Sequence, residues 1–171
     1  MNKPKIEIKN VKHAEFASQE THCFECTVYV DGKRAFKAHN TGQGGCTGFD
    51  PIQPNNHHEY SALNELIKET FPPYHFEMSG ENHTHPADLE GVINDLLEEH
   101  LRFKDFKKML KKIAFKRKGE KDIYTLPANR KPTAENLKLF KMSPQFKDCI
   151  LLNEISEKAA YSLYCRNANP T

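Results

Sequence analysis

The chain has 171 residues, with a hydrophobic content of 37% and a formal net charge of +2 from 25 Lys and Arg against 23 Asp and Glu. This length favours one domain with a single core, and the near-neutral charge argues neither for nor against a nucleic-acid partner. No segment is long and apolar enough to span a membrane, the first residues lack the apolar stretch of a signal peptide, and the five cysteines are scattered. We therefore expect a cytoplasmic protein with reduced thiols, without a cofactor and without membrane association.

The first third of the sequence predicts a small antiparallel sheet. Alternating apolar residues predict a strand over residues 5–12, with a bulge near Asn10, and β-branched and aromatic residues predict a second strand over residues 23–30. The dipeptide Asp31-Gly32 is a strong signal for a hairpin turn into a third strand.

The register of this hairpin can be predicted from the side chains. A two-residue turn would place Val28 opposite Ala35, whereas a three-residue loop ending at Lys33 places Val28 opposite Phe36 and Glu25 opposite His39. Only the second pairing separates an apolar face from a polar one, and a slip of one residue would reverse every side chain. We therefore predict the second register.

The segment 41–58 has no periodicity and is expected to be a long loop. It contains four of the eight glycines of the chain, Gly42, Gly44, Gly45 and Gly48. Such a loop can present converging backbone N–H groups to an anion such as phosphate or carboxylate, or it can simply be a folded surface connection. Its spacing matches neither standard phosphate-binding motif, so both interpretations stand.

The remaining elements follow from hydrophobic periodicity and from helix-capping residues. We expect helices over residues 60–71 and from Pro86 to about 118, the second with a weak point at residues 100–104, and a polar loop over residues 79–85. Residues 123–126, 133–141 and 149–152 read as strand, helix and strand, which predicts a right-handed βαβ unit. Asn153 is expected to cap a final helix that ends near Tyr164.

Two groups of residues are candidates for chemistry at the hairpin. Cys23 and Cys26 match C-x-x-C, but residues three apart in a strand point to opposite faces, so we predict no metal site. Cys46 and His39 could form a nucleophile and base pair, with Glu25 orienting the imidazole across the hairpin. Several such triples arise by chance in a chain with nine His and five Cys.

Charge is divided sharply along the long predicted helix. Residues 77–99 contain seven acids and no base, whereas residues 102–121 contain ten bases and two acids. The helix macrodipole alone would favour this order. Alternatively, the basic side chains form a ridge that contacts nucleic acid or an acidic protein: Lys104, Lys107, Lys108, Lys111, Lys112, Lys116, Arg117 and Lys118.

The run VYVDGKRAFKAHNTGQGGC, within residues 5–50, resembles small uncharacterised proteins of bacteria and their phages. The resemblance implies a phage or mobile-element origin and brings no activity or functional residue with it.

These observations predict a single α+β domain, in which an N-terminal hairpin sheet packs on a long amphipathic helix and a C-terminal βαβ unit follows. The expected segments are 1–58 (sheet and glycine-rich loop), 59–118 (helices), 119–165 (βαβ unit) and 166–171 (tail). The first hypothesis for function is a non-enzymatic interaction protein that binds a protein partner through the glycine-rich loop and the basic helix face. The second is nucleic-acid binding by the basic helix 102–118, and the third is a small ligand-binding enzyme or hydrolase at His39 and Cys46.

Overall fold

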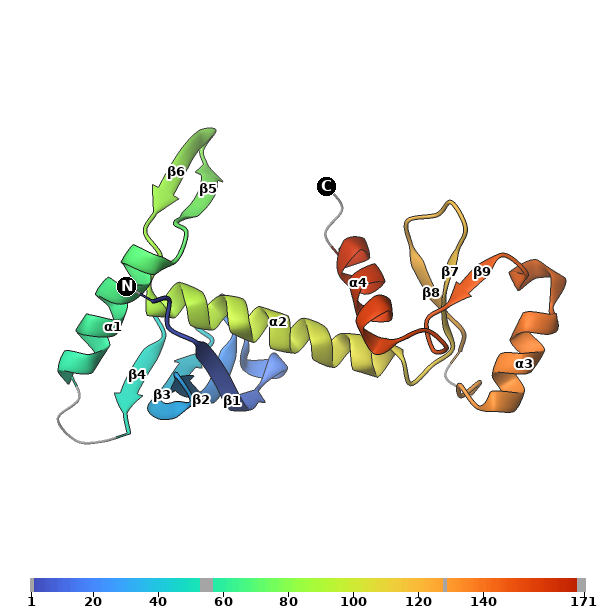
Figure 1. Cartoon of the computed structure of the whole chain (residues 1–171), viewed down its shortest axis with the longest axis horizontal. Coiled ribbons are helices and arrows are strands. Elements are labelled where there is room, and N and C mark those ends of the chain that lie inside the picture. The colour runs from blue at the N-terminus through green and yellow to red at the C-terminus, as the bar shows by residue number, and fades with distance from the viewer. Residues whose placement is uncertain (1, 53–56, 128, 169–171) are drawn as a thin grey trace. The chain divides into compact units, whose positions relative to one another are not determined.

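The computed structural model describes residues 2–52, 57–127 and 129–168 and shows an α+β protein, as the sequence predicts (Figure 1). The chain divides into two compact units, residues 1–99 and residues 100–171, called here the N-terminal and the C-terminal unit. One helix, α2 (Leu89–Met109), belongs to both. The expectation of a single domain stays a prediction.

The N-terminal unit contains a four-stranded antiparallel sheet in the order β1-β2-β3-β4. The strands are β1 (Ile6–His13), β2 (Cys23–Val30), β3 (Lys33–Thr41) and β4 (Gly48–Pro51), with a short 3-10 helix, η1 (Glu15–Ala17), after β1. Most residues of β2 and β3 that lie between the buried positions are exposed or half-buried; the buried even-numbered residues are Phe24, Cys26, Val28, Phe36, Ala38 and Asn40. This alternation gives the sheet one face toward the core and one toward solvent.

The predicted hairpin register is confirmed, but the predicted three-residue loop was wrong. Val28 lies opposite Phe36 and Glu25 opposite His39. However, Asp31 and Gly32 form a two-residue turn with φ of 48° and 79°, and the extra residue is absorbed by a bulge at Ala35. A bulge can shift register just as a longer loop does, because it places two residues opposite one.

Two other features of the sheet bear on the sequence predictions. The bulge expected near Asn10 is present, since pairing shifts between Lys9 and Lys12 and Asn10 has a φ of 54°. The expectation of loop structure throughout 41–58 was wrong, because β4 pairs with β3. Phe49 of β4 packs in an aromatic cluster with Phe36 and Tyr60. This tertiary packing stabilises a strand that the hydrophobic pattern of the sequence does not indicate. Residues 53–56 lie outside the described residues.

Helices α1 (His57–Thr70) and α2 contribute the other side of the core of the N-terminal unit. Their buried residues are Leu63, Ile67, Leu89, Val92, Ile93 and Leu97. Between the helices, β5 (Tyr74–Met78) and β6 (Glu81–His85) form a separate hairpin. The expected polar loop over 79–85 was therefore wrong: Ser79 and Gly80 form a tight turn with φ of 56° and 82°, and polar residues follow as a strand.

Helix α2 is continuous through residues 100–104 but is shorter than predicted at both ends. It ends at Met109, and a strand, β7 (Ala114–Arg117), follows after a turn. The apolar residues Ile113, Ala114 and Phe115 are buried in succession. A continuous apolar run of this kind suits a strand covered on both faces, so the prediction of helix through these residues was wrong.

The C-terminal unit has a three-stranded sheet in the order β8-β7-β9, built with β8 (Ile123–Thr125) and β9 (Cys149–Leu151). Helix α3 (Ala134–Met142) and the 3-10 helix η2 (Pro144–Phe146) connect β8 to β9, and α4 (Glu157–Ala168) follows. The βαβ prediction needs one correction. β8 and β9 each pair antiparallel with β7, so they run parallel to each other but are separated by it.

Two apolar clusters cover the two faces of this small sheet. Ala114 packs with residues of α2 and α4, including Phe106 and Ala160, whereas the next residue, Phe115, packs with Phe140 of α3. Figure 1 shows α4 and α3 on opposite sides of the sheet. The unit is therefore three layers thick, with a core on each face of the sheet.

One predicted cap is confirmed and another was wrong. Thr133 caps α3, since its hydroxyl oxygen accepts a hydrogen bond from the Asn136 N–H at 3.3 Å. Asn153 does not cap α4, which begins at Glu157. Its side chain instead donates to the backbone carbonyls of Leu110 and Lys112 and accepts from the Ala114 N–H. Helix α4 also extends to Ala168, beyond the expected end, and residues 169–171 of the expected tail lie outside the described residues.

Candidate functional site

The glycine-rich loop is organised by the buried side chain of Asn40. Its amide oxygen accepts hydrogen bonds from the Thr21 hydroxyl at 2.9 Å and from the Gly42 N–H at 2.8 Å, and its amide nitrogen donates to the Gly45 carbonyl at 2.8 Å. The Gly44 N–H donates in turn to the Thr21 hydroxyl at 3.3 Å. Two of the loop's N–H groups thus have acceptors inside the protein. Anion binding by Gly42, Gly44, Gly45 and Gly48 stays a prediction.

Gly42 is required by a close approach of two backbone segments. Its carbonyl accepts from the N–H groups of Gln19, Glu20 and Thr21, and a Cβ added to it would lie 2.3 Å from the Ala17 carbonyl oxygen. Its φ of 85° also favours glycine. These contacts give the glycine a structural role in the segment before β2.

The three residues considered for catalysis are placed on or near the solvent face of the sheet. Glu25 lies opposite His39, as predicted, but its carboxylate is 3.6 Å from the Lys12 ammonium. His39 Nδ1 lies 3.4 Å from a carboxylate oxygen of Asp50. Cys46 is exposed. A catalytic role for His39, Cys46 and Glu25 stays a prediction, and the carboxylate that lies near the His39 imidazole nitrogen is that of Asp50.

The C-x-x-C pair is divided between the two faces of β2, as its spacing predicts. Cys26 is buried in the core, and burial raises the pKa of its thiol to about 11, while Cys23 is half-buried on the other face. All five cysteines are free thiols. Within residues 2–52, 57–127 and 129–168, no cluster of three His, Cys, Asp or Glu could hold a metal ion.

The eight predicted basic residues do not lie on one helix. Lys104, Lys107 and Lys108 are on α2, but the lysines at 111 and 112 follow its end, and those at 116–118 belong to β7 and the turn after it. The prediction of a basic helix over 102–118 was therefore wrong. All eight residues lie in the C-terminal unit, and all but Lys116 are exposed.

Several of these cations have no acidic partner among the residues that the structure describes. Lys107 pairs with Glu157, and Arg117 lies 3.7 Å from Glu120. By contrast, in the part of the chain that the structure describes, no ion pair joins an acid to Lys104, Lys108, Lys111 or Lys112. Four exposed ammonium groups near the end of α2 are thus available to an external anion.

The division of charge extends to the two units as wholes. The N-terminal unit has 8 Lys and Arg against 16 Asp and Glu, a net charge of −8, while the C-terminal unit has 17 against 7, a net charge of +10. From the sequence alone, only the part of this contrast within residues 77–121 was apparent. The unit boundary, which the structure supplies, reveals the rest.

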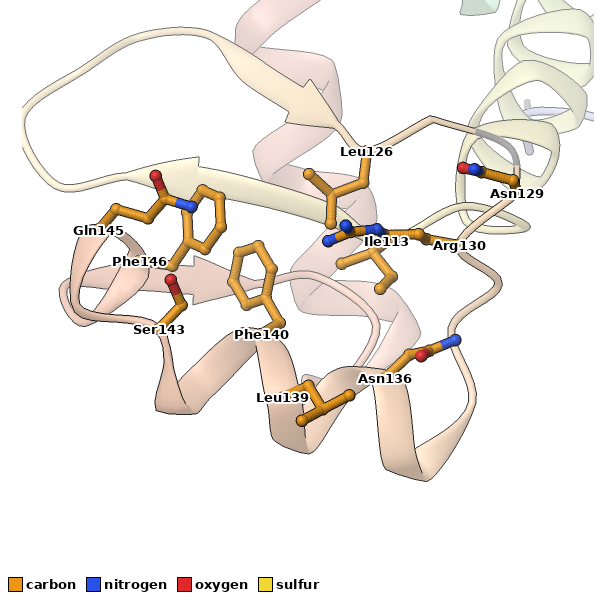
Figure 2. A pocket seen from close by; sticks show the side chains of 10 residues that line it. All are labelled: Ile113, Leu126, Asn129, Arg130, Asn136, Leu139, Phe140, Ser143, Gln145 and Phe146. Atoms are coloured by element: carbon orange, nitrogen blue, oxygen red, sulfur yellow. The ribbon is translucent and has the colours of Figure 1, made fainter.

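Sequence reasoning missed a pocket of about 380 Å³ beside α3 (Figure 2). Its apolar side chains come from α3 and η2, from Ile113 just before β7 and from Leu126 just after β8, and its polar side chains lie around them. The lining residues are Ile113, Leu126, Asn129, Arg130, Asn136, Leu139, Phe140, Ser143, Gln145 and Phe146. They are spread over more than thirty positions of the sequence, so only the fold brings them together.

Comparisons with models of known protein families, with curated proteins and with solved structures found no match for this chain. Among the described residues, no helix has the length and apolar character needed to cross a membrane. Any statement of function must therefore come from the chemistry of the surfaces described above.

Proposed function

We propose that this protein binds nucleic acid through its C-terminal unit. The observation that carries the proposal is the charge of that unit, +10 over 72 residues, together with exposed ammonium groups that form no ion pair with any acid in the described part of the chain. Positive charge of this density attracts the phosphate backbone, which dominates the affinity of most nucleic-acid-binding proteins.

The helix macrodipole does not account for this charge. It favours cations only in the last turn of α2, where Lys107 and Lys108 lie, and its influence falls off beyond that turn. Lys116, Arg117 and Lys118 are on or after β7, and further bases lie on α3 and near β9. Basic residues spread over several elements can contact a polymer such as nucleic acid, which carries a negative charge on every nucleotide.

The acidic N-terminal unit would be repelled by the same polymer, so we assign nucleic-acid contacts to the C-terminal unit alone. A protein partner bound through the glycine-rich loop and the basic residues, a cytoplasmic location and a phage or mobile-element origin stay predictions beside this proposal. The free thiols are in keeping with a reducing compartment.

The proposal can be tested with a charge-reversal variant. We expect Lys104→Glu, Lys108→Glu, Lys111→Glu and Lys112→Glu, combined in the full chain, to lower affinity for a labelled oligonucleotide at low salt by more than tenfold, measured by fluorescence anisotropy. These four are chosen because they are exposed and unpaired in the described structure, so the fold should survive, which circular dichroism would check.

A matched control reverses four exposed bases of the N-terminal unit: Lys33, Arg34, Lys37 and Lys68. This variant has the same net charge as the first, and we expect it to bind several-fold more tightly than the first. Equal loss of affinity in both would show that only the total charge matters, and full binding by the first variant would overturn the proposal.

A further inference from the structure

We infer that the pocket beside α3 accepts one unstacked base of a single-stranded nucleic acid. This inference rests on the proposed function and adds to it the form of the ligand and the site that reads it. The pocket lies in the same basic unit as the unpaired lysines, and its volume of about 380 Å³ is at the small end of ligand sites.

The floor of the pocket is apolar and aromatic. Phe140 and Phe146 are stacked with ring centroids 4.1 Å apart, and both pack on Phe115 of β7. Phe140 is buried, but Phe146 is only half-buried, so part of its ring is open to a ligand. Flat aromatic surfaces of this kind bind the faces of nucleobases with little regard to sequence.

The rim of the pocket is polar and carries side-chain amides. The Asn136 amide nitrogen donates to the Lys131 carbonyl at 2.9 Å, which orients the amide and leaves its oxygen as an acceptor. Gln145 is exposed on another side, and Asn129 and Ser143 complete the polar lining. An amide offers a donor beside an acceptor, and this arrangement matches the edges of nucleobases.

Arg130 supplies the charge at this site. Its exposed side chain lines the pocket, and Figure 2 shows it directed toward the apolar residues Leu126 and Ile113. In the described part of the chain no acid forms an ion pair with it. A guanidinium group here can stack on a base or bind the adjoining phosphate.

A base can enter the pocket only if it is not stacked within a duplex. The inference therefore predicts that single strands bind more tightly than duplexes, and that a strand lacking bases loses this advantage. Lysine contacts to phosphate do not involve the bases, so they would act alike on the ordinary and the abasic strand.

The experiment compares the full chain with two variants of α3. Leu139→Glu places a carboxylate in the pocket lining, whereas Met142→Glu places one on the same helix outside the lining. Both side chains are exposed, at 59% and 71%, so both variants should fold. Binding is measured to a single-stranded DNA oligonucleotide, to the same strand with abasic sites, and to the duplex.

We expect the parent and Met142→Glu to favour the ordinary single strand over the abasic strand by on the order of tenfold. Leu139→Glu should abolish that preference while leaving affinity for the abasic strand near that of Met142→Glu. Equal binding of ordinary and abasic strands by the parent, or identical behaviour of the two variants, would overturn the base pocket and leave the proposed function standing. Absence of binding to all three ligands would overturn both.

Discussion

The two units of this protein are built from similar parts but carry opposite charge. Each has an antiparallel sheet against helices, yet the N-terminal unit has twice as many acids as bases, and the C-terminal unit has more than twice as many bases as acids. The net charge of +2 for the whole chain is the sum of −8 for the N-terminal unit and +10 for the C-terminal unit. A near-neutral chain can therefore still contain a strongly basic binding module, and charge is best counted within structural units.

The units also use one structural device in common, an asparagine that joins backbone segments through its side chain. Asn40 holds the glycine-rich loop of the N-terminal unit, and Asn153 holds the turn between α2 and β7. The units therefore both use an asparagine side chain to join backbone segments, and they differ in the sign of their surface charge.

The largest expected effect tests whether the C-terminal unit has a core of its own. Phe106 is fully buried in the cluster with Ala114, Leu152 and Ala160. We expect Phe106→Ala to lower the free energy of unfolding by about 3–5 kcal/mol, measured by chemical denaturation, because it leaves a cavity. The matched control is Phe16→Ala, whose side chain is 95% exposed and should change little. Similar stability of the two variants would contradict a packed core around Phe106.

The second prediction compares the two asparagines. We expect Asn40→Ala and Asn153→Ala each to cost about 1–3 kcal/mol in unfolding free energy, because each leaves backbone or side-chain groups without partners. Asn82→Ala on the exposed β6 strand is the control and should be nearly neutral. If only one of the two substitutions proved costly, the units would not share this device.

The third prediction concerns the glycine-rich loop. Gly42→Ala should destabilise the N-terminal unit by about 1–3 kcal/mol, since the added Cβ meets the Ala17 carbonyl and the backbone has a φ of 85°. Gly45→Ala is a close control, because nothing lies within 4 Å of its added Cβ. Thermal unfolding of both variants would show whether Gly42 has the structural role described, and equal melting temperatures would argue against it.

The smallest effect is a pH dependence in the acidic unit. Burial, together with the hydrogen bond to Asp95 at 3.0 Å, raises the pKa of Tyr74 from 10.0 to about 12. Between these pH values the unfolded chain loses the phenol proton first, so stability should fall as pH rises from about 10 to 12. Tyr74→Phe removes this contribution, and its unfolding free energy should fall less over that range. Parallel curves for the two proteins would contradict the raised pKa.

The sequence predicts best where a strong period meets a strong turn signal. The register of β2 against β3 followed from alternation beside the Asp31-Gly32 turn, since a slip of one residue would bury Lys37 and His39, and the Thr133 cap followed from local chemistry. Strands β4 and β6 could not be predicted this way. β6 is polar throughout and exposed, and β4 is held by the packing of Phe49, which is a tertiary contact.

The candidate site was also predictable only in part, because local patterns can be seen in a sequence and tertiary contacts cannot. The basic residues were visible because they are close in sequence, although their placement on one helix was wrong. The pocket was invisible, because Ile113, Arg130 and Phe146 come together only when β7, α3 and η2 are folded around a shared core. A cluster of charged residues that are close in the sequence can be recognised from the sequence, whereas a cavity depends on how distant segments pack.

The salt dependence of oligonucleotide binding tests the central claim most directly. If phosphates bind the unpaired lysines of the C-terminal unit, the logarithm of the binding constant should fall linearly with the logarithm of salt concentration. Each lost phosphate contact should reduce that slope by about 0.7–0.9, so the fourfold reversal of Lys104, Lys108, Lys111 and Lys112 should flatten it by about 3. The fourfold control in the N-terminal unit should keep the parental slope. A parental slope in the first variant, or no salt dependence at all in the parent, would contradict the account.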